Sequence, residues 1–347
     1  MNPRPSALAD LSPAYFAMVM ATGAVSMASH LQGMRSLAHA LLWFNVAAWL
    51  ALCVLNALRA ALHRTRFFAD FVDHLRGPGF FAAVAGTSVL AAQFLIVERI
   101  DRLAVALALA ALVLWFVLTY GVFVGLTVKS EKPPLERGIS GTWLLAVVAT
   151  QSLAVLGALL AGPAGPALRL ELHFAALGLW LFGGMLYGWL MTLILYRYAF
   201  FRLTPHDMTP PYWINMGAMA ISTLAGALLI RGAHDAPFLQ SILPFLKGFT
   251  VLYWSAATWW LPLLLAFGVW RYVVQRFPLR YDPLYWGAVF PVAMYAMGTQ
   301  SMADVLSLDF LGFLPPIFLV AALAGWAVVC IGWVAHVAAR VLVRTSR

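Results

Sequence analysis

Long apolar runs separated by short polar loops dominate this sequence. A helix that crosses a bilayer needs roughly 20 mostly apolar residues. Ten stretches meet that requirement: residues 13–31, 37–58, 80–97, 103–128, 141–161, 172–198, 212–230, 248–275, 284–303 and 315–342. The pattern predicts an all-α integral membrane protein. Its one transmembrane domain spans residues 12–342, with short tails at residues 1–11 and 343–347.

The odd-numbered stretches resemble one another. Each begins near an aromatic residue, and the five residues in this position are Phe16, Phe81, Trp143, Trp213 and Trp286. They are separated by 65, 62, 70 and 73 residues. A period of that length indicates an array built from one supersecondary unit. We therefore expect five tandem helical hairpins, related by an axis along the membrane normal.

The odd and even stretches differ in side-chain size. The odd ones are rich in Gly, Ala, Ser and Thr, and the even ones in Leu, Trp and Phe. Small residues allow helix backbones to approach closely, whereas bulky apolar residues suit lipid. The sequence therefore predicts an inner ring of five odd helices around a central pore, enclosed by an outer ring of five even helices.

The ninth stretch, YWGAVFPVAMYAMGTQSM, differs from its four relatives. Four residues after each aromatic anchor lie Met20, Ala85, Val147, Gly217 and Phe290. Only Phe290 is large and aromatic, and Pro291, which follows it, removes a helix hydrogen bond and favours a kink. Phe290 with Pro291 is therefore a candidate pore gate. The alternative is that Phe290 packs between helices or against lipid.

The polar side chains inside the odd stretches are neutral hydroxyls and amides, and no Asp, Glu, Lys or Arg lies mid-span. This weighs against a tightly proton-coupled pump, which places ionisable groups at membrane depth. A Ser or Thr hydroxyl can alternatively bond its own helix backbone. The candidate pore-lining residues are Met20, Thr22, Gly23, Ala85, Thr87, Ser88, Val147, Thr150, Gly217 and Met294.

Charge predicts the orientation. Only 10% of the residues are charged, against about 25% in soluble proteins, so the net charge of +9 indicates loop charges rather than a nucleic-acid partner. The N-terminus, the loops after even stretches and the C-terminus hold 16 of the 22 Lys and Arg residues, which predicts that both termini are cytoplasmic. Neither the His nor the Cys spacing predicts a metal or cofactor site, and no nucleophile motif predicts an enzyme.

The opening SPAYFAMVMATGAVSMA, the ten-span layout and YWGAVFP in the ninth stretch resemble one family. It is the tellurite-resistance/dicarboxylate transporter family, which includes yeast malate permease, yeast sulfite efflux pumps and plant slow-type anion channels. The resemblance covers residues 12 to 340. It implies five hairpins around a pore, a homotrimer with one pore per subunit, and an aromatic gate at the position of Phe290.

We therefore predict passage of small anions through a central pore in a bacterial-type inner membrane. The resemblance suggests C4-dicarboxylate, sulfite or inorganic anions as substrates, and a tellurite-resistance phenotype. The alternative is a proton-linked C4-dicarboxylate carrier with alternating access, which would accumulate its substrate only in the presence of a pH gradient.

Overall fold

The computed structural model describes residues 8–345, with side chains to residue 339, and this part of the chain contains helices and no strand. Three helices are short: α3 (Arg64–Phe71), α6 (Leu135–Gly138) and α10 (Pro237–Ser241). The ten long ones are α1 (Ala17–Leu31), α2 (Arg35–Leu62), α4 (Phe81–Gln93), α5 (Asp101–Val128), α7 (Leu145–Ala161), α8 (Pro166–Phe200), α9 (Ile214–Gly232), α11 (Leu243–Val269), α12 (Trp286–Leu306) and α13 (Leu314–Thr345).

Nine of these helices, within the described residues, are long and apolar enough to cross a membrane. The tenth, α12, has 21 residues and lies beside them, but its Gly, Thr, Gln and Ser residues make it less apolar. The all-α membrane architecture predicted from the sequence is confirmed. The outer helices extend beyond the predicted apolar stretches. Helix α8 has 35 residues and is about 52 Å long at 1.5 Å per residue.

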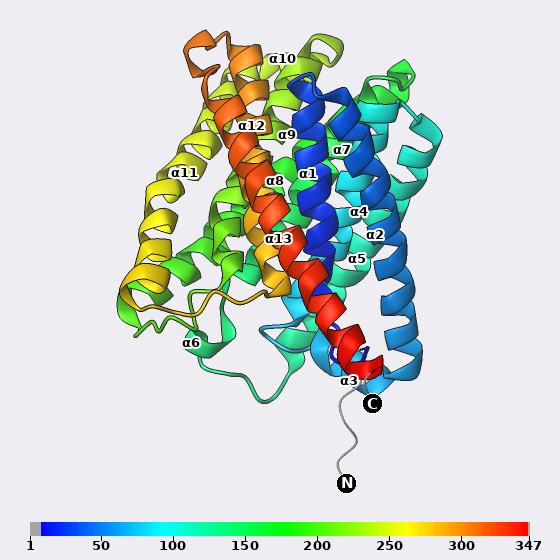
Figure 1. Cartoon of the computed structure of the whole chain (residues 1–347). Helices are drawn as coiled ribbons and strands as arrows, with labels where there is room; N and C mark the ends of the chain where they lie inside the picture. The colour runs from blue at the N-terminus through cyan, green and yellow to red at the C-terminus, as the bar shows by residue number, and fades with distance from the viewer. Residues whose placement is uncertain (1–7, 346–347) are drawn as a thin grey trace.

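The five inner helices form a closed ring. In order around the ring, α1 packs against α4, α4 against α7, α7 against α9, α9 against α12, and α12 against α1. The outer helix of each hairpin covers its own inner helix and also contacts the next one, as α5 does with α4 and α7. Between 78% and 83% of the apolar window is buried in the inner helices that meet the length and apolarity criterion, against 11% to 39% in the outer ones. The predicted inner and outer rings are therefore present (Figure 1).

Each inner helix begins with a tight 3₁₀ turn at the lower end of Figure 1. In four of the five turns, Pro is the first or the second residue. Its fixed φ suits the first turn of a helix, and the N–H that it lacks would have no partner within the helix there. The five turns contact one another in a second closed ring. They are Pro13–Phe16, Gly77–Phe80, Gly141–Leu144, Pro210–Trp213 and Pro283–Tyr285.

A tryptophan near the middle of each outer helix joins the two rings. Its indole N–H donates to the inner helix of the next hairpin, and α13 of the last hairpin donates to α1 of the first. We call these five contacts the tryptophan bridges. They are Trp49 to the Thr87 hydroxyl (2.9 Å), Trp115 to Thr150 (2.9 Å), Trp180 to the Ser222 carbonyl (2.8 Å), Trp254 to Thr299 (2.9 Å) and Trp326 to Thr22 (3.0 Å).

Loss of one bridge should destabilise the fold. Trp115→Phe removes the indole donor to the buried Thr150 hydroxyl and some packing, so we expect the free energy of unfolding to fall by about 1 kcal/mol. Thermal unfolding in detergent measures this as a lower midpoint. Trp259→Phe is the matched control because Trp259 is 59% exposed on the outer surface. Equal midpoints for the two variants would contradict the role of the bridge.

Candidate functional site

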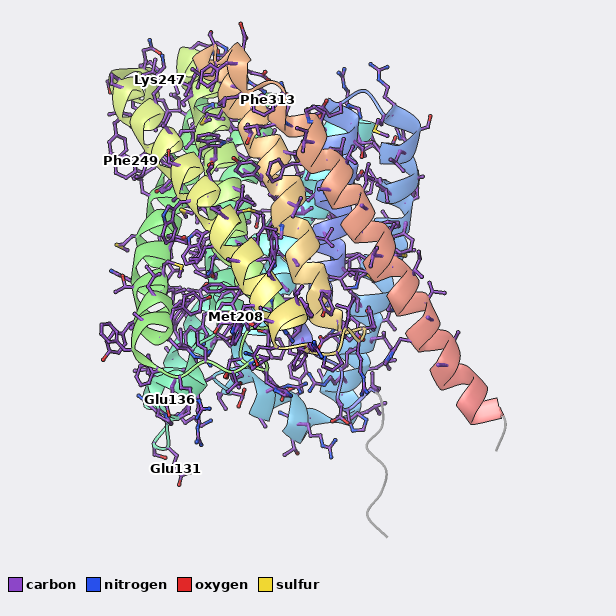
Figure 2. The ribbon with its side chains drawn as sticks, turned by 60° about the vertical axis from the view of Figure 1, so that its left-hand side comes forward. Glu131, Glu136, Met208, Lys247, Phe249 and Phe313 are labelled. Carbon is purple, nitrogen blue, oxygen red and sulfur yellow. The ribbon has the colours of Figure 1, made fainter. Side chains whose placement is uncertain are left out.

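A cavity of about 560 Å³ lies at the end of the molecule where the inner helices begin. We call it the near cavity. The segments around the five 3₁₀ turns line it, with Ser12, Gly79, Thr142, Thr209 and Leu284 representing the five repeats. The loops that carry most of the basic residues lie at this end, where the outer helices end and the next inner helices begin. Figure 2 shows Glu131 and Glu136 below Met208 at the same end. Lys247 and Phe313 lie at the opposite end.

Charged side chains line the near cavity. Three are arginines (Arg76, Arg137 and Arg197) and two are acids (Glu136 and Asp207). Arg197 is buried and donates to the Ile139 carbonyl at 2.8 Å and to Asp207 at 2.9 Å. The wall therefore has an excess of positive charge, with Arg197 fixed in place.

Asp207 stays ionised near neutral pH. Partial burial alone would raise the pKa of Asp207, but hydrogen bonds from Thr204 and the charge of Arg197 outweigh burial and lower it below its ordinary value. The stabilisation from this carboxylate is present above the ordinary pKa of an unfolded aspartate. It is lost as the pH falls through the lower pKa of the folded state.

A second cavity, of about 240 Å³, lies toward the other end. We call it the far cavity. All five inner helices line it, represented by Met27, Val89, Val155, Ile221 and Met297. The polar lining is sparse and consists of Ser88, Ser152, Ser301 and the guanidinium of Arg231. The far cavity is therefore a mostly apolar chamber on the axis of the inner ring.

Phe290 lies on α12, and along the chain it falls between residues that line the two cavities. Leu284 lines the near cavity and Met294 lines the far cavity, and Phe290 precedes Met294 by one helical turn on the same face. The Phe290 side chain is 0% exposed and is among the largest fully buried side chains. The Phe290 side chain therefore shares the helix face of Met294, while it lines neither of the two cavities itself.

The residues at the register of Phe290 can be compared on the other inner helices. Val89 and Ile221 line the far cavity, and one turn earlier on their helices lie Ala85 and Gly217. Both are at the register of Phe290 in the repeat, as is Met20 on α1. Met20, Ala85 and Val147 are buried, at 1% exposure or less. This register therefore combines one large aromatic residue with smaller residues on the other inner helices.

Residues 10–334 match the family described as voltage-dependent anion channel. The chain belongs to this family. The resemblance inferred from its motifs is thereby confirmed, and the general function of the family is the passage of anions across a membrane.

The chain is similar to an uncharacterized transporter of Methanocaldococcus jannaschii. The two are 25% identical over 317 residues, covering 87% of each. It is also similar to an uncharacterized membrane protein found in two strains of Mycobacterium tuberculosis, at 35% identity over 150 residues, covering 43% of this chain and 76% of the relative.

In this family member, three of the predicted pore-lining hydroxyls are engaged elsewhere. Thr22, Thr87 and Thr150 are the acceptors of three of the five tryptophan bridges. Their hydroxyl oxygens therefore lie at the boundary between the inner and outer rings. Thr87 and Thr150 also donate to their own helix backbone. Of the predicted residues, Ser88 and Met294 line the far cavity.

The two predicted glycines lie at helix contacts. A Cβ on Gly23 would lie 2.3 Å from Val89 Cγ1, and a Cβ on Gly217 would lie 2.7 Å from the ring carbon Cγ of Pro291. Gly217 therefore lets α9 approach the proline kink of α12 beside Phe290. This close approach is the role of small residues between membrane helices.

Sequence reasoning missed a set of basic residues that fix the loops at the near end. At the end of four outer helices, a basic side chain donates to a backbone carbonyl that precedes the inner helix of the same hairpin. We call these contacts the basic clasps. They are Arg59 to Ala9, Lys129 to Val72, Arg197 to Ile139 and Arg271 to Met208. Their separations of 70, 68 and 74 residues repeat the hairpin period and could have revealed them.

Enlarging Gly217 should disturb the contact with Pro291. Gly217→Ala places a methyl group against a proline ring and backbone that cannot move freely, so we expect a lower unfolding temperature in detergent. Gly178→Ala is the control, because nothing lies within 4 Å of its added Cβ and Ala is the better helix former. If Gly217→Ala unfolds at the same temperature as Gly178→Ala, the contact has no energetic importance.

Proposed function

We propose that small anions cross the membrane along the axis of the inner ring, between the far and near cavities, and that the Phe290 side chain closes this path. The observation that carries the proposal is the position of a fully buried aromatic residue on α12 between residues that line the two cavities. Five hairpins surround the path, and each contributes to both cavities.

The charge of the two cavities favours anions over cations. Three arginines outnumber the two acids in the near cavity, and Arg231 is the one charged residue among the described residues that line the far cavity. Cation paths carry rings of acidic side chains, whereas basic residues at a mouth raise the local concentration of anions. Apart from Arg231, the far cavity is lined by neutral hydroxyl and apolar groups.

The phenyl side chain of Phe290 in such a path would act as a barrier, because an anion that passes it loses hydration water. Phe290 offers no hydrogen bond to replace the water that an anion must lose, and an apolar constriction excludes water. Pro291 follows directly, and a kink at this point would let the N-terminal part of α12 move separately from the rest.

Truncation of the proposed gate should increase anion flux. In proteoliposomes that contain the full chain, we expect Phe290→Ala to raise chloride and nitrate efflux at least tenfold over the wild type, because the apolar barrier is removed. Phe313→Ala is the matched control, since Phe313 is 61% exposed at the far end (Figure 2). Unchanged flux of every anion in Phe290→Ala would disprove the gate.

The same assay separates a channel from the alternative, a proton-linked C4-dicarboxylate carrier. A channel moves anions down their electrochemical gradient with no applied pH gradient. A carrier of that kind accumulates malate against its gradient only when a pH gradient is imposed. The neutral lining of the far cavity near Phe290 favours the channel, because proton-linked carriers place ionisable groups at membrane depth.

We also propose an orientation and an assembly. The near cavity faces the cytoplasm in an inner membrane, because the loops at this end and the tails hold 16 of the 22 basic residues. The homotrimer and the tellurite-resistance phenotype rest on the family resemblance. A fusion of alkaline phosphatase after residue 347 tests the orientation and should be inactive if the C-terminus is cytoplasmic.

A further inference from the structure

Ser88 on α4 differs from the other buried hydroxyls of the inner helices. Ser26, Ser29, Ser152, Ser222 and Thr223 donate to backbone carbonyls at 2.7 to 2.9 Å. Four threonines accept tryptophan bridges. The Ser88 side chain is 1% exposed, and among the described residues of the inner helices its hydroxyl oxygen is the one that is fully buried and has no hydrogen-bond partner.

A buried hydroxyl without a partner costs free energy, so its retention calls for an explanation. Ser88 lines the far cavity, which offers the space for a partner that is not part of the chain. Along α4, Ser88 is three residues beyond Ala85, the residue at the register of Phe290. That separation is about 4.5 Å along the helix. By this register, Ser88 is the polar residue of the far-cavity lining that lies nearest to Phe290.

The remaining polar groups of the far cavity lead from its mouth to Ser88. Arg231 lies in the last turn of α9, and its guanidinium lies 3.9 Å from Asp304, with both side chains half-exposed. That ion pair is long and solvated, so it leaves Arg231 able to attract an anion. Ser301 and Ser152 line the wall between Arg231 and Ser88, although the Ser152 hydroxyl donates to its own backbone.

We propose that the far cavity binds one dehydrated monovalent anion of the chloride or nitrate class, and that the Ser88 hydroxyl donates a hydrogen bond to it on the far side of Phe290. The inference deepens the proposed anion passage and rests on it. Ser88 is the donor that replaces part of the lost hydration, and Arg231 supplies the attraction at the mouth.

The lining favours one charge over two. A C4-dicarboxylate places a carboxylate at each end, and each needs charged or multiple donors to replace its water. The described lining supplies one guanidinium at the mouth and a neutral, mostly apolar interior. One hydroxyl can replace part of the hydration that a small monovalent anion loses. It cannot do the same for both carboxylates of a dicarboxylate, because the desolvation penalty rises steeply with charge. We therefore expect chloride and nitrate to be preferred over malate.

The experiment measures chloride flux in proteoliposomes of the full chain carrying Phe290→Ala. Adding Ser88→Ala to this background should raise the half-saturating chloride concentration about tenfold, which is the size expected when a hydrogen bond to a charged group is lost. Ser152→Ala, in the same cavity but with a self-bonded hydroxyl, should change it less than twofold. In chloride-free buffer, Ser88→Ala should unfold at the wild-type temperature or above, because its hydroxyl has no protein partner.

The possible failures can be told apart. If Phe290→Ala carries no anion at all, the proposed anion path is wrong. If it carries chloride but Ser88→Ala leaves the half-saturating concentration unchanged, the Ser88 site is wrong and the hydroxyl holds only water. Flux of malate equal to that of chloride would overturn the preference for one charge. Bromide in crystals of the wild type gives a separate readout, since an anomalous peak beside Ser88 is expected and a featureless far cavity would contradict the site.

Discussion

Helices in a bilayer gain little from hiding apolar surface from one another, because lipid tails are as apolar as leucine. The inner ring therefore depends on close backbone packing and on polar contacts between helices. The tryptophan bridges are the repeated set of polar contacts, and each one crosses from one hairpin to the next. Because every bridge joins neighbours in the cycle, the ring is connected throughout.

Much of this architecture could be predicted from sequence patterns. The contrast between small odd helices and bulky even helices predicted the two rings, and the aromatic anchors predicted where each inner helix begins. Two predicted boundaries, residues 13–31 and 141–161, coincide with the helical spans Pro13–Leu31 and Gly141–Ala161. These features are predictable because the size of a residue in the sequence reflects whether its position faces lipid or another helix.

The direction of individual side chains could not be predicted as well. Thr87 and Ser88 are adjacent in the sequence and equally polar, yet Thr87 accepts an indole N–H from the outer ring and Ser88 lines the far cavity. Adjacent residues on a helix point about 100° apart, so an error of one residue in register exchanges these roles. A tryptophan in every even stretch was visible in the sequence, but its partner is fixed only when the helices are placed around a common axis.

The bridge between Trp326 and Thr22 has a consequence for biosynthesis. Its two residues are 304 positions apart, so the first helix made at the ribosome waits for the last before its hydroxyl receives an indole. Four hairpins can insert and join in order as they emerge, but the circle closes only when α13 arrives. The entropy cost of closing a loop rises only slowly with its length, so even this long separation can be closed. A nascent chain is thus an open arc that encloses no path across the membrane until translation is nearly complete.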